Sequence, residues 1–141
     1  DLPYFNPDLD TDTDLPSVVR DFRALIGTMD AIAICSPEYA HGMPGVLKNA
    51  LDWLVGSTEF PGKAVALINA STRSTHAYAS LTEVLKTMSA NLVVNASLTV
   101  PIPNNRVDEA TLLTDAPITA LLTQVITALV KTRAEIEDIK A

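Results

Sequence analysis

The sequence has few basic residues and no cluster of them. Its 141 residues include 10 Lys and Arg against 17 Asp and Glu, which gives a net charge of -7. Proteins that bind nucleic acid draw their affinity from Lys and Arg clusters that neutralise phosphates. We therefore expect no nucleic-acid partner, and an anionic ligand would have to be held by helix N-termini or single arginines.

Long hydrophobic runs are also absent. The longest unbroken apolar stretches, such as A-V-A-L-I at 64–68, are far shorter than the roughly 20 residues that cross a bilayer. The composition, 48% hydrophobic and 19% charged, is that of a globular protein. We expect a soluble, cytoplasmic protein without a membrane partner, folded as one domain over residues 1–141.

Cysteine and histidine are scarce. The single cysteine, Cys35, excludes an internal disulfide and fits a reducing compartment. We interpret it as a core residue of a buried strand rather than a reactive thiol, because no His and Asn arrangement accompanies it. His41 and His76 lack the carboxylate or thiol spacing of a metal site, and no G-x-S-x-G elbow of a serine hydrolase is present.

What the sequence does contain is an alternation of helical and strand patterns. Apolar residues at helical spacing predict helices over 15–28, 44–55, 76–90 and 115–139. Continuous apolar runs predict strands over 30–36, 62–69 and 91–99, the first two buried on both faces. Asp14 is the predicted N-cap of the first helix, with Pro16 in its first turn. This order predicts an α/β fold with a parallel sheet and helices on both of its faces.

The predicted sheet is narrow. Three parallel strands leave one edge with unpaired backbone groups and apolar side chains. The chain begins at Asp1 rather than at Met, and its opening residues 2–7, L-P-Y-F-N-P, resemble the middle of a domain. We therefore expect a single domain that is incomplete at its N-terminus.

The most informative stretch follows the first predicted strand. Residues 36–53 read S-P-E-Y-A-H-G-M-P-G-V-L-K-N-A-L-D-W. They form a loop with a rigid proline and a flexible glycine, followed by a helix that opens at Pro44. Open α/β sheets bind ligands at the carboxyl ends of their strands, so we expect a ligand site in this loop.

The P-E-Y motif at 37–39, followed by P-G-V-L-K-N-A-L-D-W at 44–53, resembles the NADPH-dependent FMN reductase family of quinone, chromate and azo reductases. The likeness continues more loosely over nearly the whole chain. It implies a flavodoxin-like three-layer sandwich with a parallel sheet in the order 2-1-3-4-5, of which this chain would supply strands 3, 4 and 5. No segment reads G-S-x-R-x-x-S, the loop after the family's first strand that grips the FMN phosphate.

The resemblance implies FMN as the cofactor, with NADPH or NADH as the reductant. The residues that it places beside the isoalloxazine ring in the first loop are Pro37, Glu38, Tyr39, Ala40, His41 and Gly42. Gly42 would permit close backbone approach or a positive φ. Many relatives have Asn where this chain has Ala40, so a side-chain amide is lost there.

A second loop, after the strand at 62–69, matches the family's other flavin-side loop in position. Many relatives are glycine-rich there, whereas this chain has Ser and Thr with one Arg. The resemblance implies contacts from Ser71, Thr72 and Arg73. Hydroxyls can bond to flavin carbonyls, and Arg73 can face the pyrimidine edge of the ring or the phosphates of the nicotinamide cofactor.

The implied activity is that of an FMN-dependent NAD(P)H oxidoreductase. The nicotinamide would reduce the flavin and leave, and a quinone, free flavin, azo compound or metal oxyanion would then take the electrons, so no protein acid or base is required. The family's helix at 44–55 often lies at a subunit boundary, which implies a homodimer or tetramer with Trp53 at the interface. The alternative is a flavodoxin-like binding or interaction protein, or a fragment, without flavin.

Overall fold

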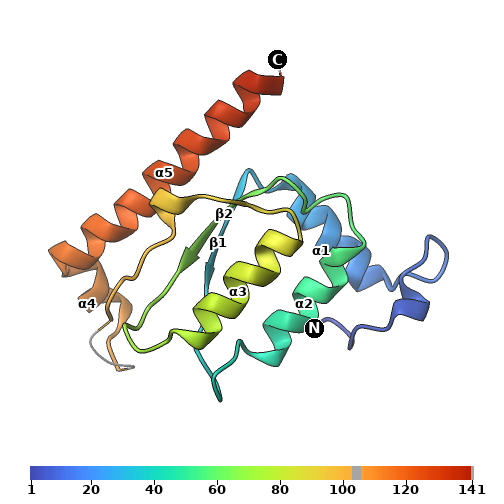
Figure 1. Ribbon diagram of the computed structural model, residues 1–141, viewed down its shortest axis with the longest axis horizontal. Coiled ribbons are helices and arrows are strands. Elements are labelled where there is room, and N and C mark those ends of the chain that lie inside the picture. Colours follow the sequence, from blue (N-terminus) through green and yellow to red (C-terminus); the bar gives the residue numbers. More distant parts are fainter. Residues whose placement is uncertain (103–105, 141) are drawn as a thin grey trace.

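A computed structural model describes residues 1–102 and 106–140, with side chains up to residue 136 (Figure 1). Within these residues one sheet has three parallel strands in the order β1-β2-β3. The strands are β1 (Ala31–Cys35), β2 (Ala64–Ile68) and β3 (Asn91–Leu92). Ala64 is the register partner of Ala31 on one side and of Asn91 on the other. The predicted α/β fold with a parallel sheet is confirmed.

Helices cover both faces of this sheet. On one face lie α1 (Ser17–Thr28), α2 (Gly45–Val55) and α3 (His76–Thr87), and on the other lies α5 (Ala116–Lys140), preceded by the short α4 (Glu109–Thr114) (Figure 1). Short 3-10 helices occupy Pro7–Leu9 (η1) and Val94–Ala96 (η2). The chain is therefore a three-layer arrangement of helices, sheet and helix.

The two cores meet at β2, whose side chains alternate between them. Val65 and Leu67 pack against α2 and α3, whereas Ala64 and Ala66 pack against α5. The first four residues of β2 are fully buried, as predicted for this strand. Small residues on the α5 side let that helix approach the sheet closely, and large ones fill the space under the other helices.

The prediction that the first strand is buried on both faces is wrong. β1 is an edge strand, and α5 packs mainly over β2 and η2 rather than over β1. Ile32 and Ile34 pack into the core beneath α1, α2 and α3. Ala33 and Cys35 point to the opposite side and are exposed, so Cys35 is not a core residue.

The third strand is much shorter than the predicted 91–99. Only Asn91–Leu92 pair with β2, and η2 then interrupts the ladder before Thr99 forms a single bridge with Asn69. The hydroxyl of Ser97 accepts the N–H of Leu67 at 3.1 Å, so a side chain takes the place of a ladder carbonyl. A side chain that competes with the backbone in this way favours irregular structure over a strand.

Several helix ends also differ from the prediction. Pro16, not Asp14, precedes α1 as its N-cap residue, and the Asp14 carboxylate instead accepts bonds from the Thr11 and Thr13 hydroxyls at 2.9 and 2.8 Å. α3 ends at Thr87. The short α4 was not predicted, although Asp108 caps it by accepting the N–H of Thr111 at 2.8 Å.

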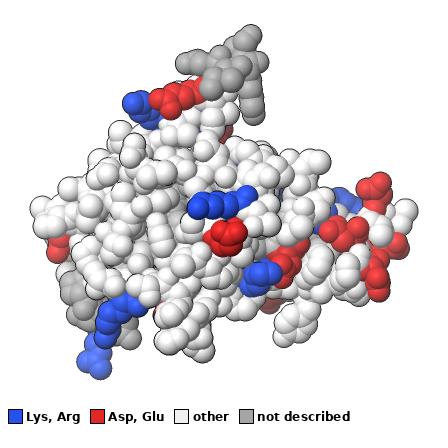
Figure 2. Space-filling model, in the orientation of Figure 1, with Lys and Arg blue, Asp and Glu red and all other residues white. Residues whose placement is uncertain are grey.

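The N-terminal segment is fastened to α2 by two residues of the L-K-N-A-L-D-W stretch. The Asn49 amide and the Trp53 indole N–H donate to the Pro3 carbonyl at 2.9 and 2.8 Å, and the Phe5 ring packs edge-on against Trp53. Trp53 is 0% exposed, so the expectation that it lies at a subunit interface is wrong. Figure 2 shows acidic side chains gathered over this N-terminal segment, at the right of the view.

Candidate functional site

The loop from β1 to α2 contains a tight turn. Tyr39 and Gly42 exchange two backbone hydrogen bonds of 2.9 Å, and the residues between them, Ala40 and His41, have φ values of 47° and 60°. Positive φ at both central residues defines a type I′ turn, which usually contains Gly or Asn. Of the two roles considered for Gly42, close backbone approach or a positive φ, the second falls to the two preceding residues.

Side chains of this first loop contact the start of α3. The Glu38 carboxylate accepts the backbone N–H of Ala77 at 2.9 Å. The His41 ring stacks on the ring of His76, with centroids 4.2 Å apart and planes inclined by 14°. The loop after β1 is thus joined to the helix that follows β2.

The loop from β2 to α3 is shaped by Asn69, which is only 9% exposed. Its side-chain oxygen accepts the N–H of Ser71 at 3.2 Å, and its amide donates to the Ser74 carbonyl at 3.0 Å. The Ser71 hydroxyl in turn accepts the N–H of Arg73 at 3.2 Å. These local bonds fix a loop without glycine, because side chains take the role that close backbone contacts have in a glycine-rich loop.

Between the two loops lies a cavity of about 460 Å³ at the carboxyl ends of β1 and β2. Its lining residues are Cys35, Ser36, Pro37, Glu38, Asn69, Ala70, Ser71, Arg73, Ser74 and Ile102. This is the edge of the sheet at which open α/β proteins bind their ligands.

The structure separates the predicted site residues into two groups. Those that line the cavity are Pro37, Glu38, Ser71 and Arg73. Those that lie outside its lining are Tyr39, Ala40, His41, Gly42 and Thr72. The turn carries Tyr39, Ala40, His41 and Gly42 away from the strand ends, and Tyr39 at its base is 66% exposed.

Sequence reasoning missed other lining residues. Cys35, Ser36, Asn69 and Ala70 sit where β1 and β2 end, so the rule that ligands bind at carboxyl ends of strands could have included them. Ile102 reaches the cavity from the segment after η2, where its N–H donates to the Ala70 carbonyl at 3.1 Å. Nothing in the local sequence signals that placement.

The cavity carries one group of each charge among its described lining residues, Glu38 and Arg73. Glu38 already accepts a hydrogen bond from Ala77, whereas Arg73 is exposed. Partial burial raises the pKa of the Cys35 thiol, so the sulfur is protonated at neutral pH. An anionic group that enters the cavity would thus meet the Arg73 guanidinium rather than a thiolate.

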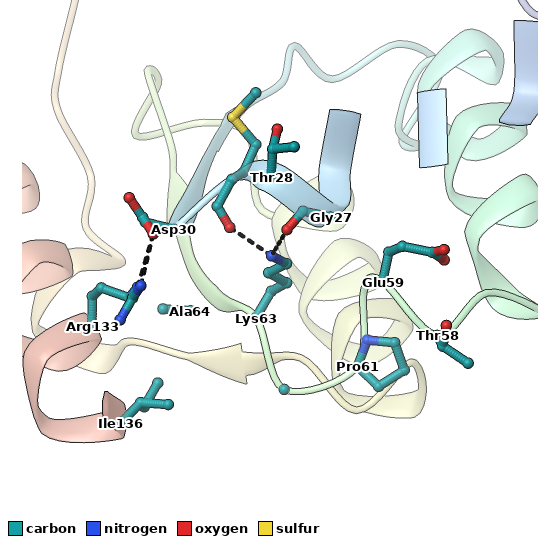
Figure 3. Close-up of a pocket in the computed structure, with 12 residues that line it drawn as sticks. Gly27, Thr28, Asp30, Thr58, Glu59, Pro61, Lys63, Ala64, Arg133 and Ile136 are labelled. Atoms are coloured by element: carbon teal, nitrogen blue, oxygen red, sulfur yellow. Dashed lines mark hydrogen bonds and ion pairs between the residues drawn. The ribbon is translucent and has the colours of Figure 1, made fainter. Parts of the chain in front are cut away.

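A second hollow, of about 550 Å³, lies at the opposite end of the strands (Figure 3). The Lys63 ammonium there donates to the carbonyls of Gly27 and Met29 at 2.8 and 2.6 Å, and Arg133 pairs with Asp30 at 2.9 Å. The cationic side chains of this hollow already bind groups of the chain itself, which makes it a weaker candidate for a ligand site.

Two absences among the described residues bear on the kind of site. No group of three or more His, Cys, Asp and Glu side chains in this part of the chain could hold a metal ion. No helix within it combines the length and the apolar character that crossing a membrane requires.

The sheet order, the helical layers and a cavity at the carboxyl ends of adjacent parallel strands define a flavodoxin-like α/β protein. Residues 1–104 match the NADPH-dependent FMN reductase family, and the chain belongs to that family. The resemblance of the P-E-Y and P-G-V-L-K-N-A-L-D-W motifs to this family is thereby confirmed.

Named relatives of this chain include several oxidoreductases. A 2-hydroxy-1,4-benzoquinone reductase from a Burkholderia species is 44% identical over 73 residues, which are 50% of this chain and 39% of the relative. An NADPH azoreductase from a Bacillus species is 40% identical over 68 residues, which are 48% and 36% of the two chains. These matches thus span less than half of each relative's own length.

A solved structure extends the likeness to almost the whole chain. FerB, a flavoenzyme NAD(P)H:(acceptor) oxidoreductase from Paracoccus denitrificans, superposes with a TM-score of 0.77 at 26% sequence identity. The superposition covers 96% of this chain and 76% of FerB. The elements after residue 104 therefore also follow the arrangement of that flavoenzyme.

Proposed function

We propose that this chain forms part of an FMN-dependent NAD(P)H oxidoreductase and that the cavity between the two loops accepts the isoalloxazine ring. The observation that carries the proposal is the position of this cavity, at the carboxyl ends of β1 and β2 in a member of the NADPH-dependent FMN reductase family. The names of the relatives, which include a quinone reductase and an azoreductase, support the same reaction class.

The residues of the cavity fit the ring half of FMN. A volume of about 460 Å³ lies within the range of about 300–1,000 Å³ that is usual for ligand pockets. Pro37, Ala70 and Ile102 offer apolar contact to a flat ring, and the hydroxyls of Ser71 and Ser74 offer donors for its carbonyl oxygens. Among the described lining residues only Arg73 offers a positive charge to a phosphate.

Bound FMN would supply the redox chemistry, by taking up a hydride and passing electrons onward. The residues of the chain would bind and orient it. We propose that Arg73 faces the pyrimidine edge of the ring or a phosphate of the reductant, because it lines the cavity and the Asn69 bonds hold the loop that presents it. No side chain of the chain is required as an acid or base, so we assign no catalytic residue.

The finer points of the proposal concern substrates and assembly. We propose NADPH or NADH as the reductant and a quinone, free flavin or azo compound as the small-molecule acceptor, in a ping-pong sequence at one site. We also propose a cytoplasmic homodimer or tetramer built from one flavodoxin-like domain per chain. The exposed Val46 and Tyr4, 81% and 93% accessible beside one another at the start of α2, support a contact surface there.

FMN titration tests the proposal directly. The quenching of FMN fluorescence is measured with this chain and with a version that carries any residues encoded upstream of Asp1. We expect saturable quenching, NADPH oxidation in the presence of a quinone, and about tenfold weaker binding in Arg73→Ala, since a charged hydrogen-bonding partner is lost. Arg20→Ala, on the exposed side of α1, is the matched control.

The alternative is a flavodoxin-like binding or interaction protein without flavin. The single positive charge among the described lining residues of the cavity favours this reading, because FMN binding normally needs a phosphate cradle as well as a ring slot. If both versions of the protein remain colourless and leave FMN fluorescence unchanged, the oxidoreductase proposal fails and the alternative stands.

A further inference from the structure

The first turn of α3 takes its cap from a different loop. Thr75, in the N-cap position, makes no capping hydrogen bond with its side chain to any described residue. Ala77, in the first turn, is only 2% exposed, so its N–H would be costly to leave without a partner. The Glu38 carboxylate satisfies that N–H from 39 residues away in the sequence. A side chain from a distant loop thus caps the first turn of α3, as a local side chain normally does.

A second contact lies beside this cap. The left-handed turn at Ala40 and His41 directs the His41 ring onto His76, the first residue of α3. L-amino acids in that conformation cost roughly 1–2 kcal/mol per residue, so the turn is held against a local penalty. The carboxylate bond and the ring stack, which we call the Glu38–His41 latch, both join loop 36–43 to the first two residues of α3.

One residue of the latch, Glu38, also lines the cavity of the proposed flavin site, so the latch adjoins that cavity. Residues 36–38 of loop 36–43 line one wall, and residues of loop 69–75, which runs directly into α3, line the other. Because the latch fixes the start of α3 against the first loop, it also fixes the end of the second loop. The separation of the two walls therefore depends on Glu38 and on the stacked rings as well as on the pairing of β1 with β2.

We propose that Glu38 is a positioning residue, which with the His41–His76 stack sets the distance between the two loops and thereby the fit of the isoalloxazine ring. This inference rests on the proposed function. It assigns the Glu38 side chain to α3 rather than to the ring. Glu38 needs only an acceptor oxygen to bond the N–H of Ala77. Gln should therefore restore most of this bond, although a hydrogen bond to a neutral acceptor is weaker.

The test compares Glu38→Ala, Glu38→Gln and the control Glu83→Ala, which removes a carboxylate from the exposed surface of the same helix. FMN affinity, thermal stability, and kcat and KM for a quinone at saturating FMN are measured for each. We expect about tenfold weaker FMN binding in Glu38→Ala, because the free energy of one hydrogen bond to a charged group would no longer hold the two loops in the binding geometry before FMN enters. We expect most of the affinity to return in Glu38→Gln and no change in Glu83→Ala.

Two results would overturn the latch. A Glu38→Ala protein that melts earlier but binds FMN as tightly as the wild type shows a cap with no bearing on the site. Failure of Gln to restore any affinity shows that charge, not position, is what Glu38 supplies. Should Glu38→Ala not fold, His76→Ala keeps the cap and removes only the stack, and unchanged FMN affinity in that variant contradicts the proposal equally.

Amide hydrogen exchange separates this inference from the proposed function, because it needs no flavin. Loss of Glu38 should raise exchange in loop 36–43 and in loop 69–75 together, since each wall restrains the other. Faster exchange confined to the first turn of α3 refutes the latch, even if FMN binds. If the wild-type protein does not bind FMN, the proposed function is refuted. The comparison of hydrogen exchange in the wild type and Glu38→Ala then still tests the latch by itself.

Discussion

The left-handed turn at 40–41 should make this chain more stable when one of its residues is replaced by glycine. Ala40 has a φ of 47° and is exposed, so its side chain can be removed with little loss of packing. Glycine adopts this region without the steric penalty of a Cβ. We therefore predict that Ala40→Gly raises the free energy of unfolding, the opposite of the usual effect of an Ala-to-Gly change.

The size of the effect follows from two opposing terms. Relief of the left-handed conformation gains roughly 1–2 kcal/mol. The added freedom of glycine in the unfolded chain costs about 0.4–1 kcal/mol. The net expectation is a stabilisation of about 0.5–1 kcal/mol, which corresponds to a rise of about 1–4 °C in Tm for a domain of this size. Ala40→Asn should act in the same direction, because Asn also tolerates left-handed φ.

Urea unfolding at constant m-value measures this difference, and two glycines of the chain provide the controls. Gly62 has a φ of 79° with no described atom within 4 Å of an added Cβ, so Gly62→Ala should cost about 1 kcal/mol from conformation alone. Gly42 lies outside the left-handed region, and its added Cβ would meet only the Tyr39 carbonyl at 3.7 Å. We expect Gly42→Ala to lie within about 0.5 kcal/mol of the wild type.

The reasoning is refuted by the opposite pattern. If Ala40→Gly destabilises the protein while Gly62→Ala is neutral, the turn at 40–41 is not left-handed in solution. If Gly42→Ala proves to be the costly change, the positive φ belongs to Gly42, the residue type that tolerates it without a steric penalty.

Three further predictions concern single side chains. Trp53→Phe removes the indole bond to the Pro3 carbonyl and should lower the free energy of unfolding by about 1–2 kcal/mol, with faster proteolysis before residue 6 as the local readout. Cys35 should react with a thiol reagent in the native protein at a rate that climbs with pH, because only the thiolate reacts and burial raises the pKa at which it forms. Bound FMN should slow that reaction, because Cys35 lines the cavity. The side-chain bond to Thr111, and then the bond from its N–H, hold the pKa of Asp108 below its usual range, so the cap is present above the unfolded pKa and lost as pH falls through the folded one. The protection of the Thr111 amide against exchange, relative to the rate in an unfolded chain at the same pH, should therefore fall in acid, and in Asp108→Asn this protection should not depend on pH.

The elements that sequence patterns predicted well are those set by a local pattern of apolar residues. The helix α2 has one amphipathic period and the strand β2 is one continuous apolar run, and both were predicted within two residues of their ends. β3 failed because the break after Leu92 depends on a bond between Ser97 and Leu67, which are far apart in the sequence. The burial of Cys35 failed for a similar reason, since an apolar run does not say which strand lies at the sheet edge.

The location of the candidate site was predictable, but its composition was not. The motif after β1 and the loop after β2 lie on either side of the cavity, because parallel strands bring their carboxyl ends to one edge. Which side chains enter the cavity depends on the turn at 39–42. In that turn Ala40 and His41 have positive φ values, which their residue types do not suggest. Ile102 enters through a backbone bond to Ala70, a contact without a local signal.

The pairing of β1 with β2 has a further consequence for the walls of the cavity. Cys35 is in register with Ile68, and each loop begins directly after one of these residues. Successive residues of a strand point to opposite faces, so a shift of one residue would turn Ile34 out of the core and exchange the side chains at the rim. Inserting or deleting a single residue in β1 would therefore dismantle the cavity while every residue of its loops stays unchanged.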